Sequence, residues 1–180
     1  MIEREIKLEF SSVEAARAAV GALGLPALRP RRLQDDALYD LPGGSLQQRG
    51  VTLRLRLDGT DGVLTWKGPV QPGPMKTRPE IESTIGEPEA MRQILESLGF
   101  GVVFRYQKYR QESGERGCIV TIDETPVGVF VEIEGEASRI AETAARLGFT
   151  VADYLTISYA GLHQARGPAL GLGPHMLFSA

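Results

Sequence analysis

The sequence predicts an α+β fold, in which eight antiparallel strands form one sheet and about four helices pack on its apolar side. Many short segments alternate between apolar and polar or charged side chains, which is typical of strands with one buried face. Turns that contain Gly, Pro or Asp separate several of these segments, which indicates hairpins and antiparallel pairing. Alanine-rich segments that end at Gly24 and Gly148 predict helices between the strands.

The first predicted strand, residues 2–8, carries charge on one face and apolar side chains on the other. Because successive side chains of a strand point to opposite sides, Glu3, Glu5 and Lys7 share a face. Ile6 and its apolar neighbours lie on the opposite face. A solvated charged face explains a single strand of this kind, but later strands repeat the pattern, so the charged face needs a further explanation.

The next part of the chain predicts one helix and one short strand. A serine precedes an apolar stripe of helical period over residues 13–23, and Gly24 ends it. Residues 25–34 contain two prolines and three arginines and are expected to form a loop. Residues 36–40 are expected to form a short strand, which ends at Pro42 and the two glycines after it.

A hairpin and a further strand are predicted in the middle of the chain. Residues 51–57 alternate strictly, residues 63–67 return, and the Asp-Gly pairs between them are a hairpin turn signal. After a loop rich in proline and glycine, residues 77–83 are expected to form the next strand. The charged faces of these strands carry Arg54, Arg56, Lys67, Arg78, Glu80 and Glu82.

The second half of the chain adds three strands and three helices. The strands are predicted at residues 102–110, 119–123 and 129–134, and the helices at residues 88–98, 137–147 and 153–164. The polar faces of these strands carry Tyr106, Lys108, Arg110, Asp123, Glu132 and Glu134. One domain is therefore expected over residues 1–165, followed at residues 166–180 by a flexible tail rich in Gly and Pro.

Composition and charge exclude several functions. A net charge of −3 over 180 residues argues against a dedicated nucleic-acid binder. No apolar stretch is long enough to cross a bilayer, and the charged N-terminus lacks the apolar run of a signal peptide, so a cytoplasmic location without membrane contact is expected. Cys118 is the only cysteine, which excludes an internal disulfide and a cysteine metal site.

The sequence also lacks the residues of several common active sites. His163 and His175 are the only histidines, both lie near the C-terminus, and neither stands beside a plausible nucleophile. A Ser/His/Asp or Cys/His arrangement and a histidine-based zinc site are therefore not expected. The chain has no Walker-type glycine loop either, so any phosphate must be bound by side chains.

Two architectures accommodate a sheet with one charged and one apolar face. An open sheet exposes the charged face to water, whereas a closed barrel places it in a central lumen and leaves the helices outside. Clustered carboxylates without His or Cys favour Mg²⁺ or Mn²⁺, while arginine and lysine favour phosphate oxygens. The residues therefore predict either a merely charged sheet or a site for a chain of phosphates together with divalent metal.

The order of these charged residues resembles that of the CYTH family, the triphosphate tunnel metalloenzymes. The likeness begins with Glu3-x-Glu5-x-Lys7 and covers residues 1–165. It continues with Tyr39-Asp40, Arg54-x-Arg56, Lys67, Glu80-x-Glu82, Lys108-x-Arg110, Asp123, Glu132-x-Glu134 and Ser158-Tyr159. One departure is Leu41, which stands where the family often has threonine. The resemblance implies an eight-stranded antiparallel closed β-barrel with helices packed outside.

The resemblance also implies a role for each charged position. Phosphate-binding positions of the family match Lys7, Arg54, Arg56, Lys67, Arg78, Lys108 and Arg110. Positions that hold Mg²⁺ or Mn²⁺ match Glu3, Glu5, Asp123, Glu132 and Glu134. Lys7 and Lys67 match a pair of lysines near the scissile phosphate, and Glu80 and Glu82 match supporting acids, one of which orders a water or tunes a neighbouring base. We expect Lys7, Lys67 and Glu82 to be the catalytic residues.

The resemblance implies two reactions for one tunnel. In a triphosphatase, water attacks the terminal phosphorus of inorganic tripolyphosphate, thiamine triphosphate or a nucleotide. In a class IV adenylyl cyclase, the ribose 3′-oxygen of ATP attacks the α-phosphorus and pyrophosphate leaves. Hydrolysis is the expected reaction because it requires fewer specific contacts. The class IV adenylyl cyclase is the alternative. A non-catalytic module that binds polyphosphate or a nucleotide is the second alternative. The expected partner is a small triphosphate, and the protein is expected to be a monomer or a homodimer.

Overall fold

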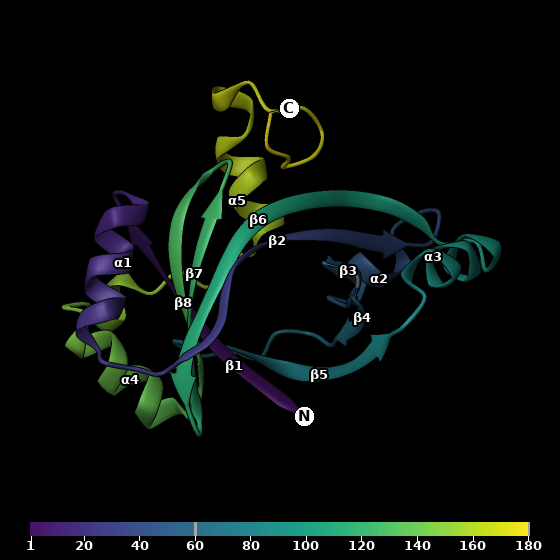
Figure 1. The fold of residues 1–180 in the computed structure, drawn as a ribbon. Helices are drawn as coiled ribbons and strands as arrows, with labels where there is room; N and C mark the ends of the chain where they lie inside the picture. The colour runs from purple at the N-terminus through teal and green to yellow at the C-terminus, as the bar shows by residue number, and fades with distance from the viewer. Residues whose placement is uncertain (60, 180) are drawn as a thin grey trace.

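The computed structural model of the protein describes residues 1–59 and 61–179; Thr60 of the predicted hairpin turn and Ala180 of the predicted tail lie outside these described residues. Within them, eight antiparallel strands close into a barrel in the order β1-β5-β4-β3-β2-β6-β7-β8 (Figure 1). The closed barrel, rather than the open sheet, is therefore confirmed. The strands are β1 (Ile2–Phe10), β2 (Ala27–Asp40), β3 (Thr52–Asp58), β4 (Asp61–Lys67), β5 (Lys76–Ile85), β6 (Gly101–Glu115), β7 (Cys118–Thr125) and β8 (Gly128–Gly135).

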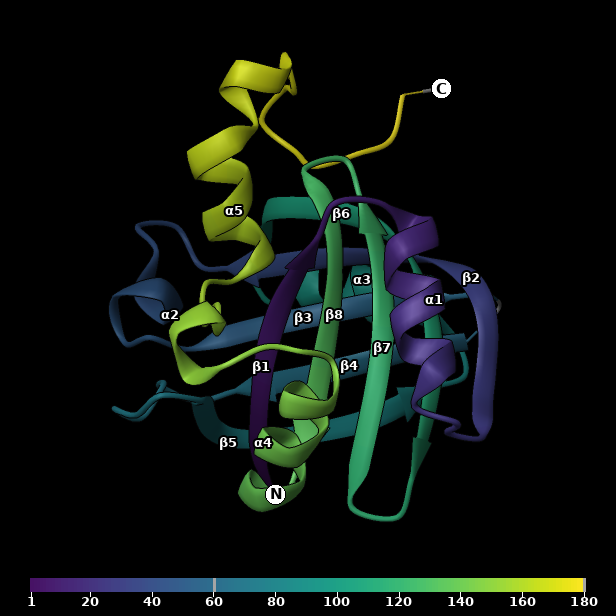
Figure 2. The same cartoon turned by 90° about the vertical axis from the view of Figure 1, so that its left-hand side faces the viewer.

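The helices lie outside the barrel, as the sequence predicts. Those in the described residues are α1 (Val13–Ala22), α2 (Ser45–Gln48), α3 (Pro88–Ser97), α4 (Ala137–Arg146) and α5 (Tyr159–Arg166). α1 and α4 cover the outer face of β1, β7 and β8 (Figure 2). α3 packs on β3 and β4, and α5 lies against β6. In the part of the chain that the structure describes, no helix has the length and apolar character needed to cross a membrane.

The main hydrophobic core lies between α1, α4 and the strands that these helices cover. Ile6 and Leu8 of β1 are buried there with Val131 and Ile133 of β8 and with Ile140 of α4. Along β1 and β8 these residues alternate with charged ones. The period of two therefore directs the apolar side chains outward under the helices and the charged side chains into the barrel. This confirms the predicted division of the strands into two faces.

The strand β2 is longer than the sequence predicts. Instead of the loop expected at residues 25–34, the structure has Ala27 to Asp40 in one strand that pairs with β6 along its length. The register shifts on both sides of Arg29, and Pro30 lies within the second shift. A proline is tolerated at such an irregularity because its missing N–H interrupts no regular ladder bond. The loop prediction was therefore wrong.

The helix predicted over residues 153–164 was wrong in its first half. Leu155 pairs with Lys7 of β1 through two backbone hydrogen bonds, which holds the chain extended there. α5 begins only after Ser158, whose hydroxyl accepts a hydrogen bond from the N–H of Gly161. Further on, Met176 is fully buried and forms backbone hydrogen bonds with β6. The tail thus follows a defined path along the barrel, while its flexibility stays a prediction.

Candidate active site

The lumen of the barrel contains a cavity of about 800 Å³. Every residue that the sequence predicts for the site lines this cavity except Asp123, which is fully buried and paired with Lys108 and Arg110. Closure of the sheet is what brings these residues together, because their strands are far apart in the sequence. The predicted residues that line the cavity are Glu3, Glu5, Lys7, Arg54, Arg56, Lys67, Arg78, Glu82, Lys108, Arg110, Glu132 and Glu134.

All four lysines of the chain line this one cavity, and all four are buried. The exposed fraction is 3% for Lys7, 8% for Lys67, 8% for Lys76 and 2% for Lys108. Lysine is one of the residues least often buried, and it is buried only with a partner. The remaining basic residues, including those on the outer surface, are arginines. This selective burial indicates that the lysines contribute positive charge to the cavity rather than to the solvent-exposed surface.

One cluster of charges lies where β1, β4 and β5 meet. The ammonium of Lys67 lies 2.5 Å from Glu3 Oε1 and 3.1 Å from Glu80 Oε2. Arg78 donates to the other oxygen of Glu3 at 3.3 Å. The register places Glu3 opposite Arg78 and Lys67 opposite Glu80, so neighbouring strands present opposite charges to each other.

A second cluster lies where β1, β6, β7 and β8 meet. Lys7 lies 2.8 Å from Glu132, and Arg110 contacts Glu132 as well. Arg110 also donates to both oxygens of Asp123, at 2.7 and 2.5 Å, and Lys108 donates to Asp123 at 2.8 Å. Three cations thus face two carboxylates, which leaves a positive excess for an incoming anion. Because cations occupy both acids in this structure, their metal-binding role stays a prediction.

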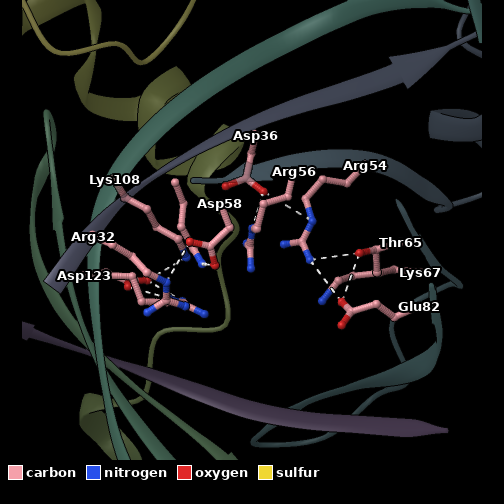
Figure 3. A network of polar contacts seen from close by, with 12 residues as sticks. Arg32, Asp36, Arg54, Arg56, Asp58, Thr65, Lys67, Glu82, Lys108 and Asp123 are labelled. Atoms are coloured by element: carbon pink, nitrogen blue, oxygen red, sulfur yellow. Dashed lines mark hydrogen bonds and ion pairs between the residues drawn. The ribbon is translucent and has the colours of Figure 1, made fainter. Parts of the chain in front are cut away.

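Asp36 of β2 is a site residue that the sequence analysis missed (Figure 3). It is fully buried, accepts a hydrogen bond from Arg56 at 2.8 Å and lies 3.4 Å from Arg54 Nε. Arg54 in turn donates to Thr65, whose hydroxyl donates to Glu82. The strand predicted from the sequence starts at Asp36 itself. No alternating residues precede it, so the pattern does not indicate which face of the sheet Asp36 occupies. In the structure, Asp36 is the carboxylate that aligns two predicted phosphate-binding arginines.

Lys76 is the second site residue that was missed. It begins β5 and donates a hydrogen bond to Glu5 of β1 at 2.6 Å. A signal for it was present, because Lys76 precedes Arg78 and Glu80 with the spacing of two that marks one face of a strand. The preceding loop, which is rich in Pro and Gly, led to an expected strand start one residue too late.

Arg32 belongs to the part of β2 that was predicted as a loop, and it extends the charged network along the barrel (Figure 3). Its guanidinium donates to Asp58 of β3 at 2.7 Å and contacts Glu112 of β6. Gln34 also donates to Asp58, at 3.0 Å. These contacts join three neighbouring strands, so this end of the network stabilises the barrel around the cavity.

The acids of the tunnel differ in how well their charge is compensated. Burial raises the pKa of Glu134 to about 7, and the nearby carboxylates of Glu3 and Glu5 add to this effect. Burial alone would also raise the pKa of Glu3, but Lys67, Lys76 and Arg78 together outweigh it and lower that pKa to about 2. Glu134 therefore has a poorly compensated charge, whereas Glu3 is strongly paired.

The carboxylates around Glu134 fit a divalent cation. An excess of negative charge surrounded by oxygen donors is the environment that Mg²⁺ and Mn²⁺ prefer. Among the described residues, however, no three Asp, Glu, His or Cys side chains converge as a ready ligand set. Glu3 and Glu5 are held by Lys67 and Lys76. Both acids are therefore paired with cations in this structure, and their metal-binding role stays a prediction.

Comparison with known proteins identifies the family to which the chain is similar. The CYTH domain family model matches residues 1–154. A Methanocaldococcus jannaschii protein provisionally named as an adenylate cyclase is 31% identical over 143 residues, which cover 79% of this chain and 81% of that protein. The adenylate cyclase CyaB of Aeromonas hydrophila is 28% identical over 168 residues, which cover 87% of this chain and 86% of that protein.

A solved structure from Hippeastrum shares the fold. It has a TM-score of 0.70 at 20% identity and covers 91% of this chain and 95% of its own. That protein is provisionally named as an adenylyl cyclase and is described as having a dominant triphosphatase activity. With a closed eight-stranded barrel, a lumen lined by the charged residues and a family match over most of its length, the chain belongs to the CYTH domain family.

Proposed function

We propose that the protein hydrolyses a triphosphate, either inorganic tripolyphosphate or an organic triphosphate, inside its tunnel with Mg²⁺ or Mn²⁺. The observation that carries the proposal is the burial of all four lysines in one cavity. The arginines that line the same cavity present planar forks suited to phosphate oxygens. Several cations along a tunnel suit a chain of phosphates, and phosphoryl transfer depends mostly on positioning and charge neutralisation.

Two of the proposed catalytic residues bind the phosphate, and the third orders the attacking water. Lys7 and Lys67 belong to different clusters and bind the scissile phosphate from two sides of the lumen. Glu82 is half exposed, accepts a hydrogen bond from Thr65 and lies 3.8 Å from Arg54. A carboxylate at that position orders the attacking water, because it is exposed to solvent and close to a phosphate-binding arginine.

The metal-holding role belongs to Glu134, with Glu3 and Glu5 as its partners. A divalent cation bound there supplies charge neutralisation at the phosphoryl oxygens. The chain's own contribution is an exchange of partners, in which the triphosphate takes over Lys67 and Lys76 from the two paired acids. Substrate and metal are therefore expected to favour each other's binding.

The alternative reaction is the conversion of ATP to cyclic AMP and pyrophosphate. The observation that favours it is that apolar side chains, among them Leu38, Val51 and Phe104, line the same cavity as the charged ones and offer a surface to a base. Two relatives also carry adenylate cyclase names. Hydrolysis is preferred because it needs no base contact and because the Hippeastrum protein of the same fold has a dominant triphosphatase activity.

One assay run in parallel tests the proposal. Purified protein is incubated with tripolyphosphate and with ATP, each with Mg²⁺ or Mn²⁺, and orthophosphate, pyrophosphate and cyclic AMP are resolved. Orthophosphate release without cyclic AMP is the expected result. Cyclic AMP with an equal amount of pyrophosphate would establish the cyclase instead. Binding of both compounds without any product would favour the non-catalytic binding module.

The substitution Arg54→Ala is expected to weaken tripolyphosphate binding by about 10- to 100-fold, because one charge-assisted contact contributes about 1.5–3 kcal/mol. The metal concentration that gives half-maximal activity should change little, since Arg54 contacts Asp36 and Thr65 rather than the acids around Glu134. Calorimetric titration and a metal dependence of turnover measure the two effects. Arg92→Ala, which changes an exposed arginine of α3, is the control. Unchanged affinity in Arg54→Ala would place that arginine outside the binding site.

Lys108 is expected to take up protons when tripolyphosphate binds near pH 8. Burial, with Arg110 adding to it and Asp123 opposing it, lowers the pKa of Lys108 to about 8, so about half of the lysines are neutral at that pH. A bound polyanion favours the charged form and raises this pKa, so the neutral half gains a proton. At pH 6 the lysine is already protonated, and the uptake should disappear.

Calorimetry in two buffers of different ionisation enthalpy measures this uptake. Tripolyphosphate also releases protons of its own when it binds to cations, so a matched variant is needed. Lys108→Arg keeps the charge but does not titrate in this range. The difference between wild type and Lys108→Arg isolates the lysine, and equal proton balances in both proteins at pH 8 would contradict the prediction.

A further inference from the structure

The segment after residue 154 lies beyond the part of the chain that the family model matches, yet it contacts the tunnel. Leu155 pairs with the backbone of Lys7 at 2.9 and 3.1 Å, and the carbonyl of Ile157 accepts a hydrogen bond from the Lys7 ammonium at 3.4 Å. Ser158 and Tyr159 line the cavity. The C-terminal segment therefore forms part of the tunnel wall.

Tyr159, the first residue of α5, contacts three charged groups of the second cluster. Its hydroxyl donates to Asp123 Oδ2 at 2.7 Å. Its ring centre lies 4.4 Å from the ammonium of Lys7 and 4.9 Å from that of Lys108. Both distances are within the range of cation–π attraction, which is stronger for a ring shielded from water. The tyrosine is 7% exposed, so this condition is met.

The ring of Tyr159 is itself held in place by other aromatic side chains. Tyr106 of β6 lies 5.7 Å away between ring centres, and Phe130 of β8 meets it edge-on at 5.9 Å. Packing alone would explain a buried aromatic residue at this position. It does not explain why two ammonium groups lie over the ring while its hydroxyl reaches the acid that binds Lys108.

We propose that Tyr159 is a positioning residue whose ring holds the ammonium groups of Lys7 and Lys108 toward the lumen. A lysine side chain has many rotamers, and each ammonium must be restrained to meet a phosphate oxygen. The C-terminal segment thereby completes the site. The inference rests on the proposed function only in taking a triphosphate as the ligand of the two lysines.

Three variants separate positioning from packing. Tyr159→Phe keeps the ring and removes the hydroxyl, whereas Tyr159→Leu removes the ring as well. Leu162→Ala loosens the same helix at a buried position of the hydrophobic cluster that contains Tyr159, and it serves as the matched control for packing. All variants are compared below their melting temperatures.

The first measurement needs no ligand. Labelling of lysine with ¹³C gives only four side-chain spin systems, and Lys67 and Lys76 act as internal references. The ε-methylene protons of Lys7 and Lys108 should be shifted upfield by the ring in wild type, in Tyr159→Phe and in Leu162→Ala. The shift should be lost in Tyr159→Leu. The second measurement is the affinity for inorganic tripolyphosphate in the presence of EDTA, which should fall about tenfold in Tyr159→Leu and stay close to wild type in Tyr159→Phe.

The two measurements also separate this inference from the proposed function. Loss of the upfield shifts and of affinity in Tyr159→Leu, but not in Leu162→Ala, supports the positioning role. Unshifted lysine protons in the wild type, or an equal loss of affinity in Leu162→Ala, would overturn it. Wild-type protein that fails to bind tripolyphosphate would count against the proposed function, while the lysine shifts would still decide the inference.

Discussion

The substitution Glu134→Gln is expected to lower the turnover of tripolyphosphate by about 100-fold or more. Burial, with Glu3 and Glu5 nearby, raises the pKa of Glu134 to about 7, so its charge is poorly compensated within the protein. In the proposed function a divalent cation compensates this charge, and glutamine cannot replace the carboxylate as an anionic ligand. Turnover at saturating Mg²⁺ and tripolyphosphate tests this expectation.

The same substitution is expected to change stability in the opposite direction. Because the pKa of Glu134 is raised in the folded state, the ionised side chain destabilises the fold. This loss of stability develops as the pH rises from about 4.5, the ordinary pKa of a glutamate, to about 7. Glu134→Gln should therefore raise the melting temperature of metal-free protein at pH 8 and change it little at pH 5. Mg²⁺ should stabilise the wild type but not the variant.

A surface acid provides the control for both effects. Glu142 lies on the exposed side of α4, outside the barrel, and Glu142→Gln should alter neither turnover nor the response to Mg²⁺. Unchanged turnover in Glu134→Gln would remove Glu134 from the site. A loss of turnover without the rise in melting temperature at pH 8 would mean that another group compensates its charge.

The alternation of side chains was enough to predict the two faces of most strands. In β1 and β8 the period of two assigned Ile6 and Ile133 to the core and Lys7 and Glu132 to the opposite face, and the structure confirms both assignments. Periodicity alone does not distinguish an open sheet from a barrel, because both have one charged face. The barrel was predicted from the order of the charged motifs, which resembles that of the CYTH family.

The sequence could not show which charges meet, because pairing depends on register between strands far apart in the chain. Asp36 contacts Arg54 and Arg56 only because β2 pairs with β3, and its strand began in a segment whose composition favours a loop. Asp123 was predicted as a metal ligand from its position in the family pattern. The structure places it between Lys108 and Arg110, which local sequence does not indicate, and its metal-binding role stays a prediction.

The largest loss of stability is expected for Asp123→Ala. This carboxylate is fully buried and accepts hydrogen bonds from Lys108, Arg110 and Tyr159. Removal of one partner of a buried ion pair leaves the other charge uncompensated, which costs about 3–5 kcal/mol of unfolding free energy. Denaturant titration with a fixed slope measures this loss. A loss below about 1 kcal/mol would show that water or other groups already solvate the two cations.

An exposed pair of similar geometry provides the comparison. Asp35 accepts two hydrogen bonds from Arg105, at 2.7 and 2.5 Å, but the arginine side chain is 47% exposed. Water and salt screen such a pair, so Asp35→Ala should lower the unfolding free energy by only about 0.2–1 kcal/mol. The two arginine forks have the same distances, but Asp123 also accepts hydrogen bonds from buried Lys108 and Tyr159. The contrast between the two aspartates therefore measures burial together with the second cation.

Tripolyphosphate should restore part of the stability that Asp123→Ala loses. In the wild type the ligand would compete with Asp123 for Lys108 and Arg110, whereas in the variant Lys108 loses this carboxylate and Arg110 keeps only Glu132. The ligand-induced rise in melting temperature, measured with EDTA present, should therefore be larger in Asp123→Ala than in the wild type. A smaller rise would mean that Asp123 holds the cations in the geometry that the phosphates need. The comparison thus decides between two roles for Asp123. Either it occupies the cations in place of the phosphates, or it holds them in the geometry that binds the phosphates.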